Sequence, residues 1–236
     1  MKNLPPFENK MSWGRTLFGL IYLPIHIIVL PLLIPGIFYG LGITDLAMIN
    51  VYYYAFSLAL VMIVFFRYLR ENFDPLVDRF FHCLITLFMG LGIYYIGNVI
   101  INLVVLGFGI TADNPNDQMV TGFALDNNAF RAAAIFMGPI VEEVLFRGAL
   151  FGGLRKKSRV LAYVLSIAIF ALTHVWQYAV AAMDLTILIY VLQYIPVAFA
   201  LAWAYERTNS IWVPIGMHMI VNAMSLAAAD LLAEMM

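Results

Sequence analysis

Residues 136–153 read FMGPIVEEVLFRGALFGG, an apolar stretch that is interrupted by Glu142, Glu143 and Arg147. Much of the chain has the same apolar character. Hydrophobic residues make up 64% of its 236 residues and charged residues only 11%, whereas water-soluble domains carry roughly 25% charged residues. Because an ionised side chain is unfavourable in lipid, carboxylates inside such a stretch indicate a functional site by default.

Apolar stretches long enough to cross a bilayer recur along the chain. A transmembrane helix needs about 20 apolar residues, and only helices and closed barrels span lipid. These runs are too long and continuous for barrel strands, so we predict an all-α, polytopic membrane helix bundle that forms a single integral membrane domain over residues 1–236. About seven transmembrane helices (six to eight) are expected, near residues 15–40, 47–69, 82–110, 129–153, 160–180, 184–205 and 211–233.

The basic residues alternate between loops and so predict the orientation. They precede the first stretch and follow the second, fourth and sixth, as Lys2, Lys10, Arg15, Arg67, Arg70, Arg79, Arg155, Lys156, Lys157, Arg159 and Arg207. Cytoplasmic loops carry such an excess of Lys and Arg. We therefore expect a cytoplasmic N-terminus, and the compact chain with short loops favours a prokaryotic plasma (inner) membrane. An interfacial helix has room in the acidic loop 111–128 or in residues 1–12.

Composition also limits the partners. No basic patch with interleaved aromatic residues is present, so nucleic acid is not an expected partner. Cys83 is the only cysteine, which excludes an intrachain disulfide. The expected partners are the lipid bilayer and a membrane-associated peptide or protein, and the sequence leaves the oligomeric state open.

The two glutamates in the opening stretch have different surroundings on their helix. Glu143 and Arg147 are spaced i, i+4, so they share a face in the order that favours a helical ion pair. Glu142 lies about 100° around the helix from Glu143 and cannot share that face equally. It is left without a partner on its own helix, which makes it the candidate general base.

Two later stretches carry further polar residues at a similar depth. His174 follows Phe170 at i+4, and His218 precedes Asn222 at i+4. At about 1.5 Å of rise per residue, Glu142, His174, His218 and Asn222 lie between ~10 and ~21 Å from the cytoplasmic ends of their helices. Three separate spans therefore direct a carboxylate, two imidazoles and a carboxamide to one layer. We predict a site there, in a membrane cavity that opens to the cytoplasmic side.

These residues form three motifs: E-E-x-x-x-R at Glu142, Glu143 and Arg147, F-x-x-x-H at Phe170 and His174, and H-x-x-x-N at His218 and Asn222. Together, in this order and on separate spans, they resemble the CAAX-protease and bacteriocin-processing (Abi) family, which includes the eukaryotic prenyl-protein proteases. The motif-bearing region covers residues 129–224, less than half of the chain. The N-terminal stretches match only as generic membrane helices.

The resemblance implies an intramembrane endopeptidase of glutamate type. By similarity, Glu142 activates a water with help from His174, and His218 and Asn222 donate to the developing oxyanion. Amide hydrolysis needs such a base, a positioned water and preorganised donors. Glu143, Arg147 and Phe170 are then structural support for the site.

Two alternatives remain open. Two His and one Glu are also a ligand set for catalytic zinc, in which case Glu142, His174 and His218 bind the metal. The spacing lacks H-E-x-x-H, and the family resemblance favours no metal and no cofactor. The other alternative is a non-catalytic immunity factor, chaperone or proton-linked carrier, because buried Glu and His also serve proton relays.

Other polar residues within the stretches have simpler interpretations. A lone His26 is expected to hydrogen-bond between helices, as polar residues in membrane bundles do. Asn98 and Asn102, spaced i, i+4, serve either as such interhelical contacts or as lining of the same cavity. Tyr52, Tyr53 and Tyr54 are interpreted as part of an interfacial aromatic belt.

Overall fold

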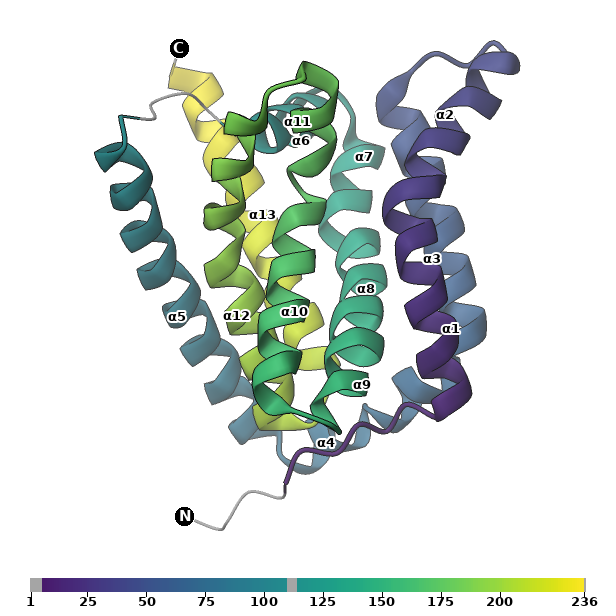
Figure 1. Cartoon of the computed structure of the whole chain (residues 1–236), viewed down its shortest axis with the longest axis vertical. Helices are drawn as coiled ribbons and strands as arrows, with labels where there is room; N and C mark the ends of the chain where they lie inside the picture. Colours follow the sequence, from purple (N-terminus) through teal and green to yellow (C-terminus); the bar gives the residue numbers. More distant parts are fainter. Residues whose placement is uncertain (1–5, 110–113, 236) are drawn as a thin grey trace.

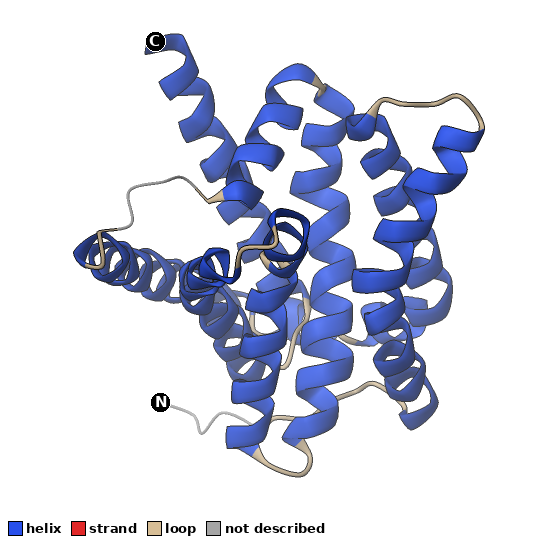
Figure 2. Cartoon of the chain, turned by 45° about the horizontal axis from the view of Figure 1, so that its top comes forward, coloured by secondary structure: helices blue, strands red, loops and turns tan. Residues whose placement is uncertain are grey.

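The computed structural model describes residues 6–109 and 114–235. Lys2 and loop residues 110–113, on which predictions were made, lie outside these ranges. The described chain is helical throughout and contains no strand (Figure 2). The helices are α1 (Trp13–Pro24), η1 (Ile25–Val29), α2 (Leu30–Gly40), α3 (Leu46–Glu71), α4 (Asp74–Asp78), α5 (Phe80–Gly107), α6 (Pro115–Asp126), α7 (Asn128–Ala132), η2 (Ala133–Met137), α8 (Gly138–Glu143), η3 (Val144–Phe151), α9 (Gly152–Arg155), α10 (Arg159–Thr173), α11 (Trp176–Ala182), η4 (Leu185–Tyr190), α12 (Val191–Thr208) and α13 (Trp212–Met235).

The predicted polytopic helical membrane bundle is confirmed, whereas the exact number of spans, expected to be about seven (six to eight), stays a prediction. Within the described residues, five helical runs are long and apolar enough to cross a membrane, and α10 with α11, bent by 44°, forms a sixth if the pair counts as one span. The run from α7 to α9, expected as the span at 129–153, is not among them. It carries Arg131, Glu142, Glu143 and Arg147, and these charges lower its apolar character. The expected single domain over 1–236 stays a prediction.

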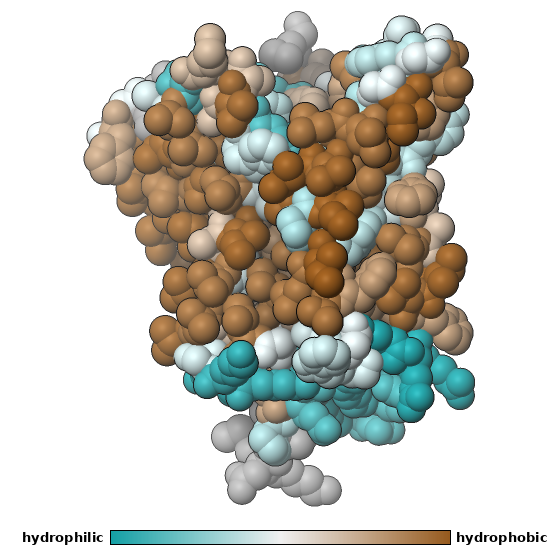
Figure 3. Space-filling view, turned by 45° about the vertical axis from the view of Figure 1, so that its right-hand side comes forward, coloured by the Kyte–Doolittle hydropathy of each residue, from teal (hydrophilic) through white to brown (hydrophobic). Residues whose placement is uncertain are grey.

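The outer surface is covered by apolar side chains, and the charged ones gather at one end. Figure 3 shows a broad hydrophobic surface above a hydrophilic band at the end of the molecule nearest the N-terminus. Ile63, Phe81 and Leu32 are among the large side chains that remain at least 71% exposed. A surface of this kind is unfavourable in water but suits contact with lipid tails.

The hydrophilic band contains the basic residues that predicted the orientation. The ends of α3 and α12, together with α4, α9 and the N-terminal segment, lie at this end of the bundle (Figure 1). We call it the basic end. Of the described Lys and Arg residues, all except Arg131 and Arg147 belong to it. The C-terminus, α6 and α11 lie at the opposite end, where Arg131 makes a bidentate pair with Asp230, with Nη–O distances of 2.6 and 2.8 Å.

The helices approach closely where glycine faces a neighbour. A Cβ atom added to Gly19 of α1 would lie 2.5 Å from the Cβ of Ala149, and one added to Gly97 of α5 would lie 2.9 Å from Pro196 of α12. Small residues permit this contact in membrane bundles, where van der Waals packing drives helix association. The first contact holds α1 against η3, and the second holds α5 against α12. η3 and α12 both belong to the motif-bearing region 129–224.

Two local features refine the predictions. The first stretch, which carries Pro24, Pro31 and Pro35, runs on as one helical span through the π-helical segment η1, and prolines and π-helical turns are common causes of bends in helices. The acidic loop does contain a helix, α6, as its composition allowed. Residues 6–12 form no helix.

Candidate functional site

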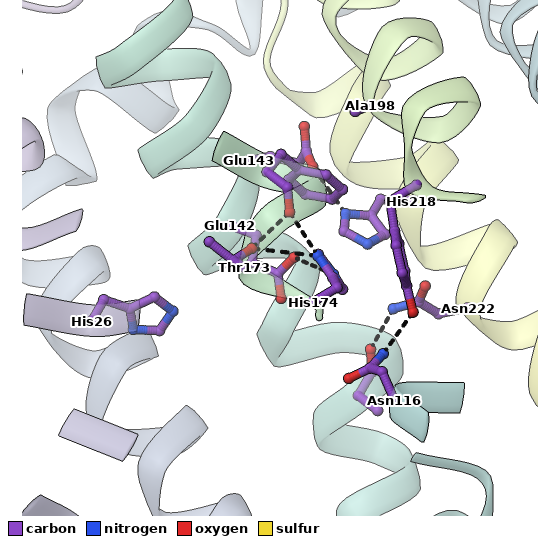
Figure 4. A network of polar contacts seen from close by, with 12 residues as sticks. His26, Asn116, Glu142, Glu143, Thr173, His174, Ala198, His218 and Asn222 are labelled. Atoms are coloured by element: carbon purple, nitrogen blue, oxygen red, sulfur yellow. Dashed lines mark hydrogen bonds and ion pairs between the residues drawn. The ribbon is translucent and has the colours of Figure 1, made fainter. Parts of the chain in front are cut away.

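The two glutamates lie on α8, a short α-helical segment between two π-helical ones. η2 precedes it and η3 follows it without interruption of the run. π-Helical turns inside α-helices occur frequently at functional sites, because they change the direction of side chains and free backbone carbonyls. Figure 4 shows that side chains from α8, from the end of α10 and from α13 meet here.

Glu143 is the centre of a buried charged cluster. Arg147 Nη1 donates to Glu143 Oε1 at 3.1 Å, as the i, i+4 spacing predicted. The Arg147 side chain is only 1% exposed and the Glu143 side chain 0%. Arg147 also donates from Nη2 to the Ala198 carbonyl at 3.3 Å, and its guanidinium carbon lies 4.2 Å from the ring centroid of Phe170. Phe170 therefore supports the ion pair through a cation–π contact.

His218 joins this cluster, a contact that the sequence spacing did not predict. Its Nδ1 lies 2.9 Å from Glu143 Oε1, the same oxygen that receives Arg147. A carboxylate oxygen accepts, so Nδ1 carries a proton and the contact fixes the orientation of the ring. The other ring nitrogen of His218, Nε2, remains available to a ligand. Only the fold brings α13 against α8, so no spacing rule within one helix could have indicated this pair.

Glu142 has no hydrogen-bonding partner for one of its oxygens. Its side chain is 15% exposed, and Oε2 is buried without a hydrogen bond to any residue that the structure describes. The nearest basic atom is His174 Nε2, at 4.0 Å. This distance exceeds a direct hydrogen bond and fits a pair of groups bridged by one water.

His174 is held by the end of its own helix. Its Nδ1 lies 2.8 Å from the carbonyl oxygen of Phe170, one of the last carbonyls of α10, which have no partner within the helix. Because a carbonyl accepts, Nδ1 carries the proton, and in the neutral ring Nε2 is an acceptor turned toward Glu142. The ring of Tyr194 stacks on His174 with centroids 4.4 Å apart. The bend after Thr173 ends α10 at this position.

Asn222 is partly engaged by the backbone. Its Nδ2 donates to the Ala134 carbonyl of η2 at 2.9 Å. A carboxamide nitrogen has two hydrogens, so one donor remains for a ligand. The contact ties α13 to the π-helical turn before the glutamates.

One cavity of about 340 Å³ is lined by all four of the predicted catalytic side chains, Glu142, His174, His218 and Asn222. Asn98 and Asn102 also line it, and Asn102 Nδ2 donates to Asn98 Oδ1 at 2.6 Å. Both roles considered for these asparagines are therefore observed, because they line the cavity and Asn102 also makes a contact between helices α5 and α12. Gln193 Nε2 donates to Asn102 Oδ1 at 3.0 Å.

A second cavity of about 230 Å³ meets the first at the glutamate. It is lined by η1, α2 and α3, and the two cavities share Tyr54, Asn116, Glu142 and His174. The carboxylate is therefore reached from two sides.

The interpretation of the tyrosine run as an interfacial belt was wrong for two of its three members. Tyr54 lines both cavities beside Glu142, and Tyr53 hydrogen-bonds through its hydroxyl to His26 at 3.0 Å. Tyr52 remains 41% exposed. A run of three tyrosines on a helix points around more than half of its circumference, a signal that at least one faces inward. The interhelical hydrogen bond predicted for His26 is confirmed.

A cavity that opens to the cytoplasmic side had been expected; the side of the membrane on which it opens stays a prediction, but its lining lies away from the basic end. Its lining comes from the middle of the bundle and from α6 and the first turn of α12, which lie toward the opposite end (Figure 1). On the side of the basic end, Glu143, Arg147 and Phe151 are at most 1% exposed. Counting residues along the helices placed the four side chains near the middle of the membrane. A side chain at that depth is about equally far from both ends of the bundle, so the count could not indicate on which side the cavity opens. The fold of α6 decides the opening.

The geometry bears on the zinc alternative as well. Within residues 6–109 and 114–235, no three His, Cys, Asp or Glu side chains are arranged to hold a metal ion. Of the proposed ligand set, His218 directs Nδ1 to Glu143 rather than to Glu142. The metal content of the purified protein is the measurement that decides. We expect far less than one zinc ion per chain by elemental analysis, and a stoichiometric zinc ion that Glu142→Gln removes would contradict this.

The site gathers the motif side chains around one cavity: a carboxylate with an unpaired oxygen, an imidazole that faces it, a second imidazole and a carboxamide. Residues 126–224 match the family described as type II CAAX prenyl endopeptidase Rce1-like. This confirms the resemblance predicted from the motifs, and the matched region begins three residues before the predicted one, 129–224.

A curated relative covers a similar portion of the chain. Over 116 residues the chain is 32% identical to "Putative membrane peptidase YdiL" of Bacillus subtilis (strain 168). The match covers 49% of this chain and 43% of that protein, so the chain aligns with less than half of the relative's length. No solved structure matches the chain.

Proposed function

We propose that this integral membrane protein is an intramembrane endopeptidase that hydrolyses a peptide bond in a membrane-associated peptide or protein, in the plasma membrane of a prokaryote. The single observation that carries the proposal is the unpaired Glu142 Oε2 at 4.0 Å from His174 Nε2, inside a cavity. The Rce1-like match and the relative named as a membrane peptidase support it.

The protonation of the two groups defines how water would bind between them. Glu142 as a carboxylate and His174 with its proton on Nδ1 both present acceptors. A water between them donates one hydrogen to Oε2 and the other to Nε2, and its lone pair is directed away from both. Such a water is oriented for attack on a carbonyl carbon, which is the geometric part of general-base catalysis.

The reaction then proceeds through a tetrahedral intermediate. The water oxygen bonds to the carbonyl carbon while its proton passes to Glu142, and the carbonyl oxygen becomes an oxyanion. His218, as an imidazolium with Glu143 as counter-ion, donates from Nε2, and Asn222 donates its second N–H. The C–N bond then breaks, and Glu142 returns the proton to the leaving amine. Each oxyanion donor contributes about 10²–10³ in rate in well-studied hydrolases.

Glu143, Arg147 and Phe170 are positioning residues in this proposal. They hold α8 and the His218 ring, and their buried atoms face each other rather than the cavity. The nearly complete burial of the ion pair keeps its charges away from the substrate.

The test uses His174, whose side chain makes no hydrogen bond to the described side chains of Glu143, Arg147 or His218. We expect His174→Ala to insert and fold normally but to lose about 10²-fold or more in cleavage rate, as loss of a positioned acid–base group does. Mass spectrometry of peptide termini compares host membranes that contain the wild type, the variant or no protein. Termini that depend on the wild type and vanish with His174→Ala support the proposal. Wild-type membranes without any new termini, or termini that persist in the variant, would overturn it.

A further inference from the structure

The most informative feature outside the reacting groups is the direction from which the cavity can be reached. Both cavities receive side chains from α6 and its surroundings: Asn116, Met119, Gln177 and Tyr178 line the smaller one, and Asn116, Asp117, Thr121 and Gln193 line the larger one. All of these segments lie toward the end of the bundle that holds the C-terminus (Figure 1). The entrance is therefore at the end opposite the basic residues.

The basic end, in contrast, is sealed by the N-terminal segment. Asn9 Nδ2 donates to the Gly148 carbonyl at 3.1 Å, and the Glu8 amide donates to Asn209 Oδ1 at 2.9 Å. A Cβ added to Gly152 would lie 2.3 Å from Asn9 Nδ2, which shows how closely the segment fits. It closes the space between η3 and the end of α12.

Buried aromatic residues fill the space above this segment. Phe151 and Tyr205 are fully buried, and the Tyr205 hydroxyl bonds to the Tyr68 hydroxyl at 2.9 Å. Above them lies the buried Glu143–Arg147 pair. A peptide approaching from the basic end would have to displace the N-terminal segment, this aromatic layer and a buried ion pair to reach Glu142.

The distribution of charge relates these two ends to the two sides of a membrane. Apart from Arg131, which is paired with Asp230, and the buried Arg147, the described Lys and Arg residues lie at the basic end. By the positive-inside rule that end faces the cytoplasm. The cavity then faces the other way.

We infer that the substrate reaches Glu142 from the extracytoplasmic side, so that the bonds cut belong to exported or membrane-anchored peptides whose scissile segment lies at or outside the outer leaflet. The inference rests on the proposed function for its substrate class, but the direction of access does not depend on it. The charge of the two linings fits this class. Among the described residues neither lining includes Lys or Arg, and Asp117 of α6 is the one acidic residue there besides Glu142. Segments with neutral or basic residues around the cut suit such linings better than acidic ones.

Thiol labelling tests the direction of access without any need for catalysis. Cys83 is the only cysteine, so Cys83→Ser gives a background into which single cysteines are placed. Thr121→Cys and Gln177→Cys probe the linings of the larger and the smaller cavity, and Gln177 is already exposed, which makes its replacement tolerable. Lys156→Cys marks the basic end. A membrane-impermeant charged maleimide is added to intact bacterial cells and, separately, to inside-out vesicles.

We expect Thr121→Cys and Gln177→Cys to react in intact cells and Lys156→Cys to react only in inside-out vesicles. If the two cavity cysteines react only in inside-out vesicles, the inference is overturned. This holds whether Lys156→Cys reacts in inside-out vesicles or in intact cells. A labelled Lys156→Cys with both cavity cysteines unreactive on either side would overturn it too.

The location of the cut bonds provides the second arm. Peptide termini that depend on Glu142 are expected in extracytoplasmic segments of host membrane proteins. Termini confined to cytoplasmic segments would overturn the inference while leaving the peptidase proposal intact. Outward labelling in a protein that produces no termini would overturn the proposed function instead and leave the direction of access standing.

Discussion

Replacing Glu142 with Gln should lower the rate of peptide-bond cleavage by about 10²–10⁴-fold, the range that a general acid–base group contributes. Gln has nearly the same shape but cannot take a proton from water or return it to the leaving amine. The carboxylate oxygen concerned has no hydrogen bond to lose, so the fold should be unaffected. The measurement is the cleavage rate of a substrate found through the host-membrane comparison, with purified wild type and variant in the same lipid.

Glu71→Gln is the matched control for this change. Glu71 is a carboxylate at the basic end whose side chain is 38% exposed and paired with Arg67, so the same substitution there should leave the cleavage rate within about twofold, as expected for a weak surface pair. An E142Q variant that cleaves at the wild-type rate would contradict the role of the carboxylate. A protective or transport activity that survives E142Q would favour the non-catalytic alternative.

Replacing Arg147 with Met should destabilise the protein by about 3–5 kcal/mol, the usual effect of removing one partner of a buried ion pair. Arg147 is 1% exposed and donates both to Glu143 and to the Ala198 carbonyl. Met fills part of the space but leaves a carboxylate with His218 as its only remaining partner. The measurement is the free energy of unfolding in mixed micelles, with loss of activity expected to follow loss of the folded fraction.

The control and the double variant make this prediction specific. Arg67→Met removes an Arg from an i, i+4 pair whose Arg side chain is 73% exposed, and it should change stability by less than about 1 kcal/mol. Combining Glu143→Gln with Arg147→Met removes both charges, so the double variant should be less destabilised than the sum of the two single variants. Strict additivity, or an effect of Arg147→Met no larger than that of Arg67→Met, would contradict a coupled buried pair.

Several features of the fold and of the site could be predicted from the sequence because they depend on local or compositional rules. The scarcity of charge over long apolar runs predicted a helical membrane bundle. The i, i+4 spacing predicted the contact of Glu143 with Arg147. Glu142 points to another side of the same helix, which predicted that it has no partner there. Comparable depths in three spans predicted a shared cavity, which all four side chains line.

The rest depends on tertiary packing that no spacing rule describes. Glu143 meets His218 because α13 packs against α8, and Tyr54 reaches Glu142 because α3 packs there too. The direction of the opening depends on α6, a short polar helix with no transmembrane character. The exact number of spans stays a prediction, because apolar length alone does not reveal a 44° bend or weigh the charges carried by a helix.

The most direct test of water activation by Glu142 follows the oxygen of the water itself. Purified wild type and E142Q are each incubated with the identified substrate in ¹⁸O-labelled water, and the products are analysed by mass spectrometry. The account predicts one ¹⁸O atom in the new carboxyl terminus made by the wild type and no such product from E142Q. A product without ¹⁸O, or an equal amount of labelled product from E142Q, would contradict it.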